Sequence, residues 1–146
     1  MPRYFYAGLL IVVIVILTLF FYRTNSIVSE SATVGEFGGV SLIIDVASTS
    51  EAQARGLSGR TRIPGDYGMF FVFQKDGMHG FWMKDMLVPI DIFWLDDKGQ
   101  VISIAEEVAT SSYPNVFYPS APARYVLETA AGFARTHSIA TCTPLY

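Results

Sequence analysis

The sequence predicts an α+β fold: an N-terminal transmembrane helix, then a small β-rich domain with a mostly antiparallel, curved sheet or barrel and one or two short helices. Three observations support this prediction. The segment 4–22 contains no charged residue. Several later segments are rich in β-branched and aromatic residues and are bounded by turn signals. Strands and helices do not alternate regularly, which disfavours a doubly wound parallel sheet.

Residues 1–23 are expected to form a transmembrane signal anchor. A helix needs about 20 apolar residues to cross the hydrocarbon core, and the segment 4–22 provides them, with aromatic residues at both ends that suit the headgroup regions. A cleaved signal peptide is the alternative, but no small-x-small site follows Tyr22. Arg3 favours a cytoplasmic N-terminus. The expected location is the cytoplasmic membrane, single-pass, with the C-terminal domain outside the cytoplasm.

The remainder of the chain divides into a linker and one domain. Residues 24–39 are polar and rich in turn-forming residues, which indicates an irregular linker. Residues 40–146 are expected to form the exported β-rich domain. Its first strand is Val40–Ala47, where apolar side chains recur at every second position.

A short helix is expected after this strand. Thr49 or Ser50 can cap its N-terminus, and Gly56 can end it. Met69–Phe73 is apolar on both faces and therefore indicates a buried central strand, while 74–77 is a turn signal.

The stretch 81–97 contains both tryptophans of the chain. Its β-branched and aromatic residues predict two strands, Phe81–Met86 and Ile90–Leu95. Pro89 cannot donate a hydrogen bond to a sheet, so it marks the break between them. If the turn at Pro89 makes a hairpin, Asp91 can lie near Lys84 or Asp85.

The C-terminal third contributes further elements. Strands are predicted at about 100–108 and 124–128. Between them, 109–123 is a long, proline-containing loop of the kind that often forms a binding loop or lid. A short helix is expected within 130–140, and the tail 141–146 carries no clear signal.

Composition and charge exclude several classes of function. From residue 24 onward the chain carries 8 basic and 13 acidic residues, a net charge of −5. The basic residues are scattered, which disfavours nucleic-acid binding because phosphate contacts supply most non-specific affinity. The single cysteine, Cys142, excludes an internal disulfide. His79 and His137 belong to no metal-binding motif, so neither a metal nor a cofactor is expected.

Candidate binding residues gather in the central stretch. Lys84 and Asp91 can lie at the mouth of an aromatic pocket lined by Trp82 with Phe93 or Trp94, since ligand pockets combine apolar walls with a few polar groups. A structural ion pair and a turn-capping carboxylate are the alternative.

A second candidate set lies on the strand near residue 126. Arg124 and Glu128 are four residues apart and share a face of that strand, and Arg60 or Arg62 could approach them. The pair is either structural, or the guanidinium binds a ligand carboxylate in a bidentate manner.

Four motifs occur in the order and at the spacing of a known family: ExxxRGLxGR (51–60), GMxFxF (68–73), FWMKDMxxPIDI (81–92) and YPSxPARYVLE (118–128). They resemble the bacterial and archaeal family of uncharacterised proteins catalogued as domain of unknown function 192. The resemblance implies a compact β-rich α+β domain, often exported or membrane-anchored, with no established activity.

Two departures from the family pattern stand out. Asp85 occupies a position where asparagine is usual, and the C-terminal part lacks the Gly-Asp-containing strand, so the closing strand is expected to be altered or missing. By this resemblance the best site candidates are Arg60, Trp82, Lys84, Asp91, Pro119, Arg124 and Glu128.

The leading functional hypothesis is a membrane-anchored, non-catalytic binding or accessory module at the cell envelope, acting on a glycan, a peptide or a small polar ligand. The alternative is an envelope hydrolase that uses Asp91 or Glu128 as its acid/base, which requires two carboxylates, or a carboxylate and Lys84, in one cleft. A third possibility is a structural partner-binding domain with an exposed apolar patch.

Overall fold

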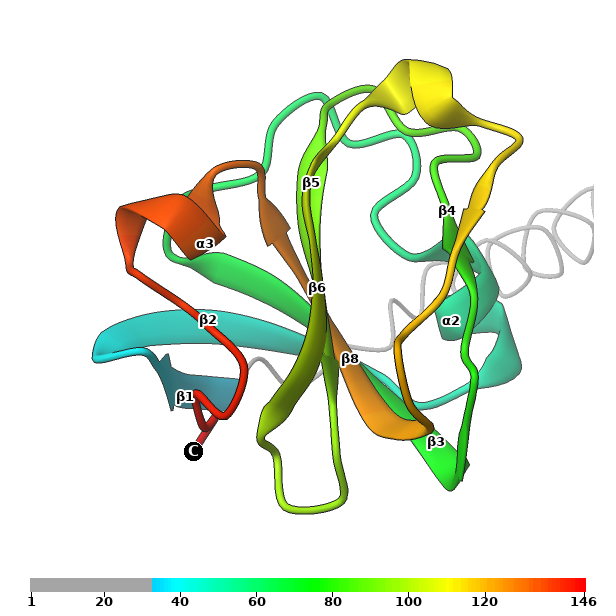
Figure 1. The fold of residues 1–146 in the computed structure, drawn as a ribbon. Coiled ribbons are helices and arrows are strands. Elements are labelled where there is room, and N and C mark those ends of the chain that lie inside the picture. The colour runs from blue at the N-terminus through cyan, green and yellow to red at the C-terminus, as the bar shows by residue number, and fades with distance from the viewer. Residues whose placement is uncertain (1–32) are drawn as a thin grey trace, which may run out of the picture.

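The computed structural model describes residues 33–146, and the predicted anchor lies outside this range. Within it, no helix has the length and apolar character needed to cross a membrane. Figure 1 shows a curved sheet with one short helix on each side. The elements are β1 (Thr33–Phe37), β2 (Val40–Ala47), α2 (Ser50–Arg55), β3 (Tyr67–Gly77), β4 (Phe81–Trp82), β5 (Ile90–Leu95), β6 (Val101–Val108), the 3₁₀ turn η1 (Thr110–Ser112), β7 (Val116–Phe117), β8 (Ala123–Ala130) and α3 (Phe133–Thr136).

The main sheet has six strands in the order β1-β2-β3-β8-β5-β6. Only β2 and β3, which α2 connects, run parallel, and all other neighbours are antiparallel. β4 and β7 form a separate two-stranded ribbon. The prediction of a small β-rich domain with a mostly antiparallel, curved sheet and two short helices is confirmed.

The C-terminal tail closes the sheet by pairing with both of its edge strands. On the β1 side, Glu36 and Tyr146 exchange two backbone hydrogen bonds of 2.9 Å. On the β6 side, the N–H of Val101 donates to the carbonyl of Thr143 at 3.0 Å, and Cys142 donates back to Val101 at 2.7 Å. The closing strand is thus altered rather than missing, and the tail pairs the edges that would otherwise be exposed.

Strand β5 is buried on both faces and separates two apolar clusters. Ile92 and Trp94 belong to the cluster beneath α2 and the β4–β7 ribbon. Phe93 and Leu95 belong to the cluster beneath α3 and the tail. Each such side chain contributes about 1.5–3 kcal/mol when fully buried. The alternation of β5 therefore fixes which residues can reach each side of the sheet.

The predicted helix after β2 is confirmed, and Thr49 is its cap. The hydroxyl oxygen of Thr49 accepts a hydrogen bond of 3.2 Å from the N–H of Ala52. Gly56 ends the helix with φ +48°, a conformation that glycine adopts without strain. The short helix expected within 130–140 is also present, as α3.

The segments Phe81–Met86 and Ile90–Leu95, between which a hairpin was one possibility, do not pair with each other. β5 pairs with β6 on one side and β8 on the other, which leaves no edge for a further strand. β4 ends at Trp82 and pairs with β7 instead. Beyond it the chain turns away from the sheet at Asp85, where φ is +56°, and buries Met86.

Three segments expected to be irregular contain strands. Residues 33–37, expected within the linker, form β1, and 74–77, expected as a turn, continue β3. The pairing of β3 with β8 is interrupted between Val72 and Gly77, which explains the turn-like sequence there. The long loop 109–123 contains η1 and β7.

Deleting residues 142–146 is expected to lower the free energy of unfolding by about 2 kcal/mol or more, because backbone hydrogen bonds worth roughly 0.5–1.5 kcal/mol each are lost. In NMR hydrogen exchange, the amides of Glu36 and Val101 should lose protection. Removing Tyr146 alone is the matched control, since it frees the Glu36 amide only. Full protection of both amides in the longer deletion would show that the tail does not close the sheet.

Candidate functional site

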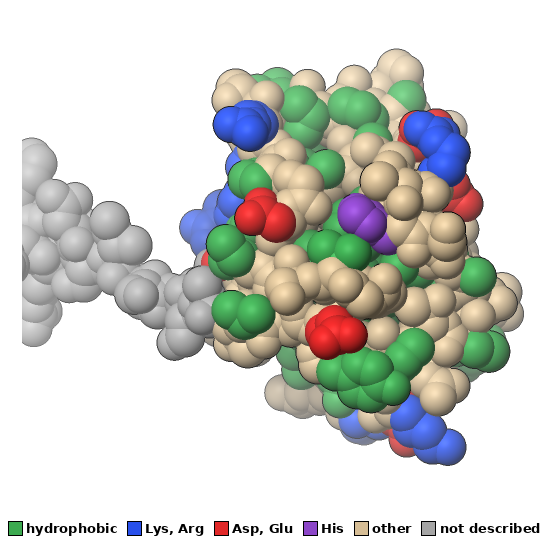
Figure 2. Space-filling model, turned by 90° about the vertical axis from the view of Figure 1, so that its left-hand side faces the viewer, with side chains coloured by type: hydrophobic (Ala, Val, Ile, Leu, Met, Phe, Trp, Pro, Cys, Tyr) green, Lys and Arg blue, Asp and Glu red, His purple; other side chains and the backbone are tan. Residues whose placement is uncertain are grey.

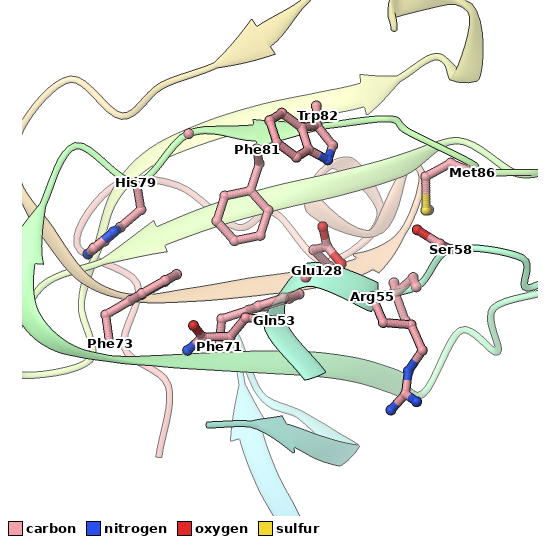
Figure 3. A pocket seen from close by; sticks show the side chains of 14 residues that line it. Gln53, Arg55, Ser58, Phe71, Phe73, His79, Phe81, Trp82, Met86 and Glu128 are labelled. Atoms are coloured by element: carbon pink, nitrogen blue, oxygen red, sulfur yellow. The ribbon is translucent and has the colours of Figure 1, made fainter. Parts of the chain in front are cut away.

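A pocket of about 270 Å³ lies on the α2 side of the sheet. It is bounded by α2 and the turn after it, by the middle of β3, by β4 and by Glu128 of β8. Figure 3 shows the carboxyl group of Glu128 in the midst of the side chains that line the pocket. The residues that line the pocket therefore come from segments spread between positions 53 and 128.

Glu128 is the polar group at the base of this pocket. It lies opposite Ile92 of β5 and Met69 of β3, so its side chain points to the α2 face of the sheet. Its relative exposure is 5%, and Oε2 has no hydrogen-bond partner among the described residues. Burial raises the pKa of this carboxyl group from 4.5 to about 8. The side chain is therefore mostly protonated and uncharged at neutral pH.

Aromatic side chains form much of the wall. The ring of Phe81 stands edge-on to that of Phe71, with 4.9 Å between centroids, and lies 6.4 Å from Phe73 in the same geometry. Trp82 is 52% exposed and lies at the rim. Such edge-to-face pairs hold the rings in defined orientations.

Gln53 is fixed at one side of the pocket by its amide group. Its Nε2 donates to two backbone carbonyls, that of Ala47 at 3.3 Å and that of Val72 at 2.8 Å. These bonds use both amide hydrogens and tie α2 to the end of β2 and to the middle of β3. The amide oxygen is what Gln53 can offer to a ligand.

Ser58 and His79 are held in a similar way. The hydroxyl of Ser58 donates to the carbonyl of Lys84 at 3.0 Å. Nε2 of His79 lies 3.1 Å from the carbonyl of Lys75, and its ring stacks on Phe73 with centroids 3.6 Å apart. Because a carbonyl only accepts, this contact places the hydrogen on Nε2 and leaves Nδ1 of a neutral ring as an acceptor.

Asp91 lies on the opposite face of the sheet from Glu128. It is fully buried, and its carboxylate accepts hydrogen bonds from the backbone N–H groups of Glu107 (2.7 Å), Gly132 (3.1 Å) and Ala134 (2.8 Å). It therefore holds the start of α3 and the end of β6. Asp91 and Glu128 cannot act on one substrate, because the sheet separates them.

The predicted arginine candidates form ion pairs outside the pocket. Arg60 lies 3.3 Å from Asp45 and over the ring of Tyr67, 4.7 Å from its centroid. Arg124 contacts Asp76 at 2.6 Å rather than Glu128. These pairs are partly exposed, and pairs of this kind contribute about 0–1 kcal/mol each.

The structure thus brings two of the seven predicted site residues, Trp82 and Glu128, into one pocket. Lys84 is exposed and Pro119 is buried, and neither lines the pocket. The expected aromatic partners are elsewhere: Trp94 is buried in the core beneath Phe81, and Phe93 lies on the other face.

Sequence reasoning missed several lining residues: Gln53, Ser58, Phe71, Phe73, His79 and Phe81. One signal could have found the two β3 phenylalanines. They recur at period two in the GMxFxF motif, and the register places them on the face that Val126 and Glu128 share. No motif marks Gln53 or His79, since their role depends on tertiary contacts.

Within residues 33–146, no group of three or more His, Cys, Asp or Glu side chains is arranged to hold a metal ion. Glu128 is the single acidic residue among those that line the pocket. The arrangement suits binding of an organic ligand through one polar group and aromatic walls.

Fold and site together define a small α+β domain with a closed sheet and a pocket built around one buried acid. The chain belongs to the domain of unknown function 192 family, described as Uncharacterized ACR, whose profile matches residues 33–145. This match confirms the family resemblance of the four sequence motifs. A comparison with curated proteins found no match.

Two solved structures are similar to this chain. One is a candidate transcription regulator from Sinorhizobium meliloti 1021, with 25% identity, a TM-score of 0.70 and coverage of 73% of this chain and 81% of that one. The other is a protein of unknown function from Novosphingobium aromaticivorans DSM 12444, with 24% identity, a TM-score of 0.75 and coverage of 84% and 89%. The second similarity concerns the fold alone.

Asp91→Ala is expected to lower the free energy of unfolding by roughly 3 kcal/mol or more, because it leaves two buried N–H groups and one partly buried N–H group unpaired, at about 1–3 kcal/mol for each buried one. Asp91→Asn, which keeps an acceptor oxygen, should cost less. Urea unfolding measures both. The exposed Asp97→Ala is the control and should change stability by less than about 0.5 kcal/mol. A similar small loss for Asp91→Ala would contradict the structural role.

Glu128 should make stability depend on pH. In the folded protein the Glu128 carboxyl group keeps its proton up to about pH 8, whereas in the unfolded chain it keeps it only up to about pH 4.5. The free energy of unfolding therefore falls as pH rises between these values. The slope is at most about 1.4 kcal/mol per pH unit. Glu128→Gln should lose this slope and gain stability relative to wild type at pH 8. The exposed Glu106→Gln should behave as wild type; equal slopes in all three proteins would refute a buried neutral Glu128.

Proposed function

We propose that this protein is a non-catalytic binding module and that the pocket between α2 and β4 is its ligand site. The observation that carries the proposal is Oε2 of Glu128, a buried polar atom without a hydrogen-bond partner among the described residues. Leaving such a group unpaired costs about 1–3 kcal/mol, which a ligand can recover by supplying the partner. Perturbed carboxyl groups in clefts are concentrated at functional sites.

The size of the pocket supports a small ligand, or one side chain of a larger one. Its volume of about 270 Å³ lies near the lower end of the ~300–1,000 Å³ typical of small-molecule sites. Trp82, at the rim, offers a large exposed ring that a ligand would cover. Glycans fit less well than apolar ligands with a single polar group, because aromatic side chains form much of the pocket wall.

Binding is favoured over hydrolysis by the arrangement of the charged groups. A hydrolase of the expected kind needs a second carboxylate, or Lys84, beside Glu128. Asp91 lies across the sheet and is satisfied by three backbone N–H groups. Lys84 is exposed and does not line the pocket.

The charge pattern of this chain does not favour the role of a transcription regulator, which is how the Sinorhizobium protein is described. Three arginines of the present protein, Arg60, Arg124 and Arg135, are each paired with a carboxylate. On the face shown in Figure 2, Lys and Arg side chains lie apart at the margins, with acidic side chains among them. Nucleic-acid binding depends on a continuous basic surface, so this charge pattern favours another kind of ligand.

The proposal includes a location at the cell envelope. It rests on the uncharged segment 4–22, which is long enough to serve as a membrane anchor. A domain held outside the cytoplasm by such an anchor would sample ligands of the periplasm or the exterior.

Thermal unfolding of the full chain in detergent, against a panel of small amphiphiles, peptides and envelope glycans, tests the proposal. A ligand at 100 times its dissociation constant adds about 2.7 kcal/mol, which raises the melting temperature measurably. The shift should disappear in Trp82→Ala and Glu128→Gln. It should persist in Tyr113→Ala, which removes an exposed aromatic outside the pocket. A shift that both pocket variants retain would place the site elsewhere.

A further inference from the structure

Three polar side chains that line the pocket, those of Gln53, Ser58 and His79, offer acceptors rather than donors. The amide hydrogens of Gln53 and the hydroxyl hydrogen of Ser58 are donated to backbone carbonyls. The Nε2 hydrogen of His79 is donated in the same way. What these three side chains offer is the amide oxygen, the hydroxyl lone pairs and Nδ1, and Glu128 adds further acceptors when its carboxyl group is ionised. A ligand that donates hydrogen bonds is complementary to such a set.

The single acidic side chain of the pocket favours a positively charged ligand. Glu128 is the single acid among the lining residues, and it has no basic partner. Arg55 also lines the pocket, but Figure 3 shows its side chain extending away from Glu128. Ionising a buried carboxyl group is costly without a positive partner. The pocket itself provides no such partner for Glu128, and a cationic ligand would supply it.

The aromatic walls of the pocket also favour a cationic ligand, for an independent reason. The faces of Phe and Trp rings carry negative charge density and attract cations within about 6 Å. Phe71, Phe73, Phe81 and Trp82 all line this pocket, around the same carboxyl group. Aromatic cages are a common means by which proteins recognise quaternary ammonium groups.

From these three observations we infer that the ligand is a small organic cation, an ammonium group carried on a mostly apolar body. The ammonium group would approach Glu128, and the apolar body would contact the rings and Trp82 at the rim. The inference rests on the proposed function, because it specifies the ligand of the same pocket.

Binding of such a cation has a consequence that a neutral ligand lacks. Burial keeps Glu128 protonated up to about pH 8, whereas a bound cation stabilises its ionised form. The proton then leaves for the solvent as the cation binds. At pH 7 close to one proton should be released per ligand, and affinity should rise up to tenfold per pH unit until about pH 8.

Matched pairs of probes test the inference. Choline and 3,3-dimethylbutan-1-ol have the same shape but differ in charge, and choline has no proton to lose near neutral pH. Butylammonium and butan-1-ol form a second pair, in which the cation donates N–H hydrogen bonds. Isothermal titration calorimetry of the full chain in two buffers of different ionisation enthalpy gives both the affinity and the number of protons released.

We expect at least one cation to bind tenfold or more tightly than its neutral partner at pH 8, with proton release at pH 7. Glu128→Gln, shown by circular dichroism to be folded, should lose this preference and the proton release. Tyr113→Ala should keep both.

Tighter binding of the neutral probes than of the cations, lost in Trp82→Ala, would overturn the cation assignment and leave the binding module standing. An equal cation preference in wild type and Glu128→Gln would also overturn it. If no probe binds and no compound of the broader panel does, both the cation assignment and the binding function are wrong.

Discussion

The carboxylate of Asp91 is the contact on which the arrangement of this domain depends. It is buried in the central strand β5 and accepts three backbone hydrogen bonds, one from β6 and two from the start of α3. A buried carboxylate is tolerated only when it is paired or richly hydrogen-bonded. The same bonds fix α3 over the apolar cluster that includes Phe133, and they satisfy N–H groups that a helix start leaves open. Asp91 is therefore a structural residue, although its sequence context is that of a candidate site.

Glu128 presents the opposite case on the neighbouring strand. Both carboxyl groups are buried, and both belong to central strands, but pleating directs them to opposite faces. Asp91 meets backbone N–H groups, whereas Glu128 meets aromatic rings and the turn after α2. An unsatisfied acid in the middle of a folded domain reduces stability, and such costs are concentrated at functional sites. The contrast between the two residues is the physical reason for assigning the function to Glu128.

Much of the fold follows from local sequence. The period-two pattern of Val40–Ala47, the cap at Thr49 and the glycine at Gly56 each predict the element that the structure contains. The hairpin after Phe81 could not be excluded from sequence, because strand propensity does not say which edge is available. β5 finds its partners far away in the chain, and the short β4 pairs with β7 instead.

The candidate site was less predictable than the fold, for a related reason. Trp82 and Glu128 are among the predicted residues, but the sequence indicates mainly neighbours that lie close to them along the chain. Lys84 lies two residues from Trp82, yet the chain turns at Asp85 and carries it to the surface. Gln53 enters the pocket because α2 packs beside β3, and His79 enters it because its ring stacks on Phe73. These tertiary contacts, and not the local sequence, decide which polar hydrogens of the pocket remain free to bind a ligand.

Closure of the sheet also explains why the pocket lies where it does. The tail and α3 cover one face of the sheet, and the cluster beneath them contains fully buried residues such as Phe37 and Phe93. The other face is covered by a six-residue helix and by a ribbon in which β4 and β7 pair over only two residues each. A cover held by few backbone hydrogen bonds opens at lower cost than a closed sheet does. The same weakness leaves room beside Glu128 for a ligand, and the binding of that ligand would add the contacts that this side of the domain lacks.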